Sequence, residues 1–141
     1  MNLHQPKYLE LAWGELGTRE IAGAEHNHRI TAYHATTMGG ESPDEVSWCS
    51  SFVNAMVTRG GVTGTNSKAA RSWMTWGEDC EPEYGCVCVL WRVDPKSWQG
   101  HVGFLVGEDG GNVYMLGGNQ SNRVRVSRYP KNRVLGYRRA G

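Results

Sequence analysis

A change in hydrophobic periodicity near Gly85 is the feature that most constrains the fold of this 141-residue chain. Before that residue, apolar side chains recur every three to four positions, which is the spacing of amphipathic helices. After it, apolar and polar residues alternate, which is typical of half-buried strands. Helices followed by strands with short connections predict an α+β domain, in which an antiparallel sheet packs against a helical layer. At this length we expect a single domain spanning residues 1–141.

The helices of the first half are marked by their end signals. Pro6 stands at a first-turn position and Gly17 at a C-terminal capping position, so they bound a first helix. Ser47 is a good N-cap for a helix from about Trp48 to Arg59. Two further helices are expected at residues 30–35 and 68–76.

The strands of the second half are separated by turn residues. The run Glu-Asp-Gly-Gly at 108–111 predicts a hairpin turn between the second and third strands. The expected strands cover residues 86–93, 101–107, 112–116, 123–127 and 134–138.

Composition is that of a globular protein, with 39% hydrophobic and 21% charged residues. The net charge of +1 gives no reason to expect nucleic acid as a partner, although residues 123–139 are locally basic and favour a polyanionic surface. No run approaches the roughly 18 apolar residues of a membrane span, so stable membrane insertion is not expected. The first six residues lack the charged and apolar regions of a signal peptide, which predicts synthesis in a cytoplasm. We expect a monomer.

Cys49 is the candidate nucleophile. If Ser47 caps the helix, Cys49 lies in its first turn, where unpaired N–H groups and the positive end of the helix dipole stabilise an anion. A thiol there has a depressed pKa, and its thiolate is the nucleophilic form. The same N–H groups can bind the oxyanion that forms when a carbonyl is attacked. The alternative interpretation is a buried structural thiol, the commoner state of a free cysteine.

His101 is the candidate general base. It follows Gly100 and begins an apolar strand, so its side chain can reach a helix N-terminus packed against the end of the sheet. There it would form an ion pair with Cys49 and later protonate the leaving amine. Considered alone, a histidine at a strand end is more often a surface residue. The flanking glycines favour the catalytic role because they let a substrate backbone approach closely.

Asn119 is the predicted third residue, which would hold the tautomer and orientation of His101. Antiparallel pairing across the 108–111 turn brings the far end of the next strand beside His101. That strand ends in Gly-Gly-Asn-Gln at 117–120. Gln120 is the second candidate, and Asn119 could also be only a turn residue.

No metal or other cofactor is predicted. Cys86 and Cys88 are expected on one face of a strand, with Cys80 apart from them, but C-x-C is not the usual spacing of a zinc site. The four cysteines are expected to be reduced. The histidines of one polar stretch are expected to be solvated: His26, His28 and His34.

Five of the six tryptophans divide into two groups. Trp13, Trp73 and Trp76 have helical spacings that predict core positions. Trp48 and Trp98 flank the catalytic residues and could form walls of a substrate groove, whereas Trp48 could equally anchor the helix start in the core. The residues expected to contact a substrate are Trp48, Ser50, Trp98, Gln99, Gly100 and Gln120.

Three stretches of the chain resemble the NlpC/P60–CHAP superfamily of cysteine peptidoglycan hydrolases, and in particular small single-domain members among phage endolysins. These stretches are Trp48–Val53, Gly100–Phe104 and Gly117–Gln120. With further similarity in residues 20–33 and 129–138, the likeness covers nearly the whole chain, and it implies a papain-like fold. It also implies Cys49 as nucleophile, His101 as base and Asn119 as third residue. Many CHAP members carry an acidic residue near the third position, where Gly117 aligns here.

The resemblance implies hydrolysis of an amide bond in bacterial peptidoglycan, by an N-acetylmuramoyl-L-alanine amidase or a peptide endopeptidase. Such a thiol hydrolase would be bacteriolytic, made in a bacterial host cytoplasm and released to the wall through a pore or secretion system. Three alternatives stay open. They are a secreted antibacterial effector with the same chemistry, a thiol deamidase or acyltransferase acting on a non-wall substrate, and an inactive wall-binding domain. The sequence argues against the last of these, because all the chemical groups of the enzyme are in place.

Overall fold

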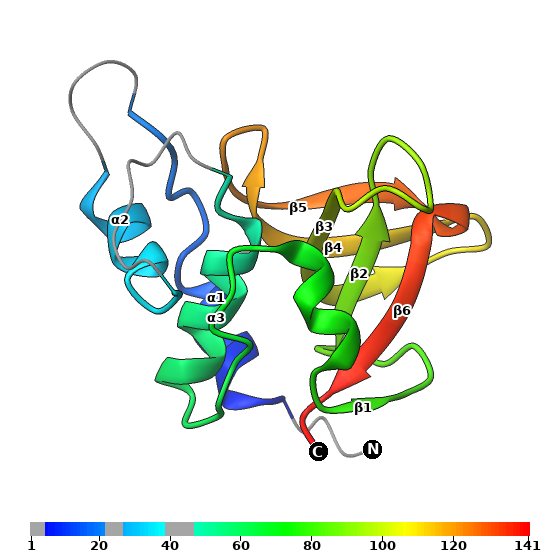
Figure 1. Ribbon diagram of the computed structural model, residues 1–141, viewed down its shortest axis with the longest axis horizontal. Coiled ribbons are helices and arrows are strands. Elements are labelled where there is room, and N and C mark those ends of the chain that lie inside the picture. The colour runs from blue at the N-terminus through cyan, green and yellow to red at the C-terminus, as the bar shows by residue number, and fades with distance from the viewer. Residues whose placement is uncertain (1–4, 22–26, 39–46) are drawn as a thin grey trace.

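The protein, described here by a computed structural model over residues 5–21, 27–38 and 47–141, places its helices to one side of a curved sheet (Figure 1). The sheet has six antiparallel strands in the order β1-β6-β2-β3-β4-β5. The predicted combination of N-terminal helices with a C-terminal antiparallel sheet is confirmed. Within the described ranges, no helix has the length and apolar character needed to span a membrane.

The elements follow one another in the order expected from the periodicity. The helices are α1 (Lys7–Trp13), α2 (His28–His34) and α3 (Cys49–Arg59), with 3-10 helices η1 (Ala70–Thr75) and η2 (Lys131–Arg133). The strands are β1 (Glu78–Asp79), β2 (Val87–Trp91), β3 (Gly100–Glu108), β4 (Asn112–Gln120), β5 (Arg123–Pro130) and β6 (Val134–Arg139). The two-residue strand β1 was not predicted.

Three details of the predicted helices are wrong. Helix α1 ends at Trp13, and its C-cap residue is Gly14 rather than Gly17. The N-cap residue of α3 is Trp48 rather than Ser47, and its side chain makes no capping hydrogen bond. The Trp48 ring is fully buried, and its indole N–H donates to Oε1 of Glu20 at 2.7 Å, so packing of the ring fixes the helix start. Segment 68–76 contains a 3-10 helix rather than an α-helix. Trp73 lies within this helix and Trp76 is its C-cap residue, and their rings meet edge to face with centroids 5.0 Å apart.

The main core lies between the helices and one face of the sheet. α3 is buried along most of its length and packs on β3 and β4. Alternate residues of the strands, such as Val87, Val102 and Phe104, point toward it. The opposite face of the sheet carries a second apolar cluster: Cys86, Cys88, Leu90, Leu105, Val113 and Met115. The tryptophans at 73 and 76 are in the main core as predicted, and Trp13 is half-buried against it.

Gly118 lets α3 lie close to β4. A Cβ atom at this position would be 2.7 Å from the Trp48 ring and 2.8 Å from Cβ of Phe52. We therefore expect Gly118→Ala to lower the free energy of unfolding by about 1–3 kcal/mol, the usual cost of overpacking. Gly110→Ala, in a turn with no atom within 4 Å of the added Cβ, should change it by less than about 0.5 kcal/mol. Urea unfolding of both variants tests this, and equal midpoints would contradict the close-packing role.

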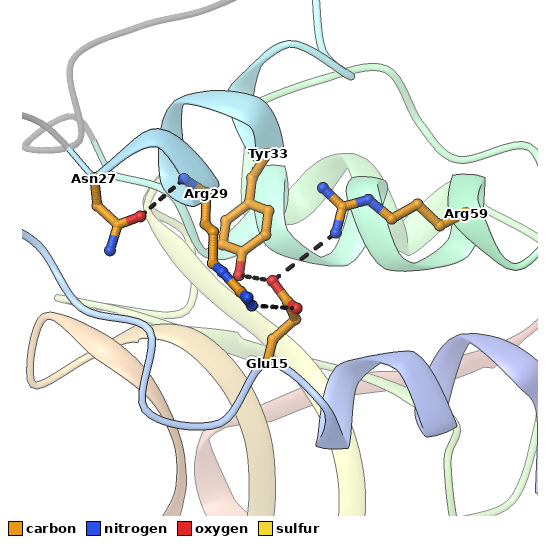
Figure 2. Close-up of polar contacts among 5 residues, drawn as sticks. All are labelled: Glu15, Asn27, Arg29, Tyr33 and Arg59. Atoms are coloured by element: carbon orange, nitrogen blue, oxygen red, sulfur yellow. Dashed lines mark hydrogen bonds and ion pairs between the residues drawn. The ribbon is translucent and has the colours of Figure 1, made fainter.

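A polar cluster around Glu15 ties the segment after α1 to α2 and α3 (Figure 2). The Glu15 carboxylate accepts from the Tyr33 hydroxyl at 2.6 Å and from the Arg29 guanidinium at 2.8 Å, and Arg59 lies 3.9 Å away. Asn27 caps α2 by accepting from the backbone N–H of Arg29 at 2.8 Å. Burial, reinforced by Glu15, raises the pKa of Tyr33 well above its ordinary value, so its hydroxyl remains a donor.

Part of the outer edge of β5 is covered by the chain that follows α1. Gly17 donates to Val124, Val124 donates to Thr18, and Glu20 donates to the carbonyl of Asn122. This pairing places Glu20 where it can hold Trp48, and with it the start of α3.

Candidate active site

Cys49 lies where α3 meets the sheet. It is the first residue of the helix and only 3% exposed. The helix start is held by Trp48 on one side and by the Ser50 side chain on the other. The Ser50 hydroxyl donates to the Ser67 carbonyl at 2.6 Å and accepts from the Trp73 indole at 2.9 Å. The thiol therefore has a fixed position in the first turn, as its sequence context predicts.

His101 is the second residue of β3 and is 7% exposed. Its backbone pairs with Leu90 of β2, which fixes the beginning of the strand. The preceding Gly100 has no room for a side chain, since a Cβ there would be 2.9 Å from the Leu90 carbonyl oxygen. The imidazole is thus held at the end of the sheet that faces the start of α3.

Cys49 and His101 interact directly, and the pKa of the Cys49 thiol is lowered. Burial acts in the opposite direction and would raise this pKa. The hydrogen bond with His101 and its charge outweigh burial, with help from the backbone N–H groups of Val102 and Ser50. These groups favour the thiolate, which is the nucleophilic form.

Gln120, rather than Asn119, is the hydrogen-bond partner of His101. Its Oε1 lies 2.8 Å from Nε2 of the imidazole. Its amide nitrogen donates to the carbonyls of Met115 at 3.1 Å and Arg125 at 2.6 Å. Because both amide hydrogens are used there, the oxygen must face His101, and an amide oxygen only accepts. Nε2 therefore carries a hydrogen, which leaves Nδ1 as the ring nitrogen for the thiol.

A bulge in β4 determines that Gln120, and not Asn119, contacts His101. Phe104 pairs with Leu116, and continuing that register by three residues on each strand would place Asn119 opposite His101. Asn119 instead has a φ of 59°, and the pairing of β4 with β5 shifts between Gly117 and Gln120. The extra residue turns Gln120 to the imidazole, and the Asn119 amide donates to the Ser47 hydroxyl at 3.3 Å. The predicted contact of Asn119 with His101 is corrected accordingly.

Tyr129 of β5 is a further neighbour of the imidazole. Its hydroxyl is 3.3 Å from Nε2 of His101, and the two ring centroids are 5.3 Å apart. Burial and the nearby Cys49 raise the pKa of Tyr129 to about 12, so the phenol stays neutral. Since Nε2 carries a hydrogen, the phenolic oxygen accepts there, which adds a second acceptor for a positively charged imidazole.

The residues predicted to contact a substrate differ in their exposure. Trp48 and Ser50 are fully buried and structural, so neither offers a surface to a substrate. Trp98 is 81% exposed, on the loop between β2 and β3. Arg71 fixes that loop by donating to three of its carbonyls, including that of Gln99 at 2.9 Å. Gln99 is half-buried beside it.

The remaining cysteines lie away from Cys49. All four are free thiols. Cys86 and Cys88 share one face of the sheet, as predicted, and burial raises the pKa of Cys86 to about 12 and that of Cys88 further. Burial and Glu83 raise the pKa of Cys80. In the part of the chain that the structure describes, no group of three His, Cys, Asp or Glu side chains could hold a metal ion.

The histidine predictions were partly wrong. His34 was expected to be solvated, but it is fully buried on α2, with Nδ1 2.7 Å from the Ser51 hydroxyl. The helical spacing from Ile30 and Tyr33 was the available signal, because it places position 34 on the buried side of the helix. His28 is exposed, as expected, and His26 lies outside the described residues.

Two residues at the site were not predicted from the sequence. Glu20 holds Trp48, and Tyr129 contacts His101. Both come from segments distant in the chain that meet through β5, so no local pattern identifies them. Comparison with protein-family models and with curated proteins found no match.

Proposed function

We propose that this protein is a cysteine hydrolase of the NlpC/P60–CHAP type, with a papain-like fold, that cleaves an amide bond of bacterial peptidoglycan. The observation that carries the proposal is the buried row of Cys49, His101 and Gln120, in which the thiol pKa is lowered and the tautomer of the imidazole is fixed. A structural cysteine needs neither feature. The other three cysteines have raised pKa values.

The proposed reaction follows from the positions of these groups. The Cys49 thiolate attacks the carbonyl carbon, and N–H groups at the start of α3 stabilise the oxyanion. The His101 imidazolium gives its proton from Nδ1 to the leaving amine, which leaves a thioester on Cys49. His101 then takes a proton from water, which attacks the thioester and releases the acid. Gln120 accepts from Nε2 throughout and keeps the ring in one orientation.

The proposed substrate rests on the residues that resemble wall hydrolases and on the surface beside the site. Trp98 is exposed on a loop that Arg71 holds in place, and an aromatic ring so presented can stack on a sugar. The bond cut would be the N-acetylmuramoyl-L-alanine amide or an amide within the peptides.

Digestion of purified sacculi tests the function. Wild-type protein should release soluble fragments, which mass spectrometry then identifies. Fragments in which sugar and peptide have parted would indicate an amidase, and shortened stem peptides or split cross-links an endopeptidase. Sacculi left unchanged by folded protein would refute action on the wall, and a deamidase or acyltransferase with another substrate would then take its place.

A further inference from the structure

A hollow of about 530 Å³ opens beside β5. Its lining residues are Tyr114, Ser121, Arg125, Val126, Ser127 and Arg128. None of them is acidic, and two are arginines. The hollow therefore offers cationic and hydroxyl groups to a ligand.

Arg125 connects this hollow to the catalytic residues. It pairs with Gly117 of β4, and its carbonyl accepts the Gln120 amide at 2.6 Å. Gly117 is close to the same amide, since a Cβ there would be 2.9 Å from its Oε1. Antiparallel partners point to the same face of a sheet, so Arg125 lies on the face that carries the Gln120 side chain.

A row of side chains continues along β5 from Arg125 to the imidazole. Arg125, Ser127 and Tyr129 are two residues apart, so they lie on one face of the strand. The Tyr129 hydroxyl interacts with Ser127 and lies 3.3 Å from His101. Arg125 and Cys49 both act electrostatically on that hydroxyl. The row meets the Nε2 side of the imidazole, away from the thiol, so only a part of the substrate that extends past His101 can reach the hollow.

Asp109 is bonded to one end of the hollow, where its carboxylate accepts from the Tyr114 hydroxyl at 2.7 Å. Over the described residues, neither Arg125 nor Arg128 has an acidic group within ion-pairing distance. Arg125 is exposed, and its described side-chain contact is a long one of 3.4 Å to the Ser121 hydroxyl. Arg128 interacts with the Tyr114 hydroxyl, which leaves Arg125 as the guanidinium most available to a ligand.

We propose that Arg125 and the serine hydroxyls beside it form a subsite for a free carboxylate of the peptide whose amide bond lies at Cys49. A guanidinium presents paired N–H donors that match the two oxygens of a carboxylate. The subsite selects substrates that carry an unamidated carboxylate near the bond that is cut. This inference rests on the proposed function, because it takes a wall peptide as the substrate.

The test uses soluble disaccharide–peptide fragments of peptidoglycan and versions of them in which one carboxylate at a time is amidated. Binding is measured by calorimetry on Cys49→Ala protein, with or without Arg125→Gln. Arg139→Gln is the control, because it removes an exposed arginine on β6, far from β5 in the strand order, where it pairs with Glu78. Arg125→Lys keeps the positive charge but loses the paired N–H donors of the guanidinium.

One of the amidations should weaken binding about fivefold, the size expected of an exposed charge pair. The preference for the fragment with the free carboxylate should disappear in Arg125→Gln, persist in Arg139→Gln and be reduced in Arg125→Lys. Equal binding of all fragments, or a preference that survives Arg125→Gln, would overturn the subsite. So would Arg125-dependent binding of glycerol phosphate oligomers without any carboxylate preference.

Cleavage of the same fragments by protein that retains Cys49 separates this inference from the proposed function. Cleavage whose preference is unchanged by Arg125→Gln overturns the subsite and leaves the function standing. Arg125-dependent binding of the free acid, without cleavage of any fragment or of sacculi, supports the subsite and overturns the hydrolase.

Discussion

Cys49→Ala is expected to lower the release of fragments from sacculi by at least about 10³-fold, because it removes the only nucleophile of the proposed mechanism. The residual rate should equal that of sacculi incubated without protein. Release is measured as soluble fragments over time, with mass spectrometry to confirm their identity. Ser50 cannot replace the thiol, since its hydroxyl is buried and bonded to Ser67 and Trp73.

Folding controls make this result interpretable. Alanine is nearly the same size as cysteine, so thermal unfolding of Cys49→Ala should stay within a few degrees of wild type. Cys80→Ala is the matched variant, because it removes a half-buried thiol on the other side of the sheet and should keep full activity. Release by Cys49→Ala at the wild-type rate would contradict the assignment of the nucleophile.

Gln120→Ala should have the second largest effect, and it should act on both activity and stability. The Met115 and Arg125 carbonyls and Nε2 of His101 would all lose a buried partner. We expect the free energy of unfolding to fall by about 2–4 kcal/mol. Activity should fall roughly 100-fold in kcat, because the imidazole is no longer held in one tautomer. Urea unfolding and fragment release measure the two quantities.

The neighbouring amide provides the control. Asn119→Gly keeps the left-handed backbone that the bulge requires and removes only the side chain that contacts Ser47. Its activity should stay within about twofold of wild type, as for a surface change. If Asn119→Gly lost activity while Gln120→Ala kept it at a temperature where both are folded, the orienting role would belong to Asn119.

The order of helices and strands could be predicted because it depends on local periodicity. Val87 and Val89 alternate with Cys86 and Cys88 between the two faces of the sheet, as the period of two requires. The ends of elements were less accurate where tertiary packing determines them. Burial of Trp48 sets the start of α3, although Ser47 is the better capping residue in isolation.

Two residues of the candidate site could be predicted from the sequence, but the partner of His101 could not, because it depends on the bulge in β4. Cys49 and His101 could be identified because a helix start and a strand start are local features. The partner of His101 depends on whether β4 continues its register, and an asparagine with positive φ is compatible with either a turn or a bulge. Tyr129 and Glu20 reach the site through pairings along β5, which periodicity does not specify.

Alkylation of the four thiols at pH 7 tests the pairing of Cys49 with His101 most directly. Iodoacetamide reacts with the thiolate, so at pH 7 a thiol with a lowered pKa has a larger reactive fraction than thiols whose pKa is raised. Peptide mass spectrometry should show that Cys49 is modified first, ahead of the more exposed Cys80. The substitution His101→Ala should lower the rate of Cys49 alkylation by about tenfold or more. Modification of Cys80 before Cys49, or a Cys49 rate unchanged by His101→Ala, would contradict a thiolate held by the imidazole.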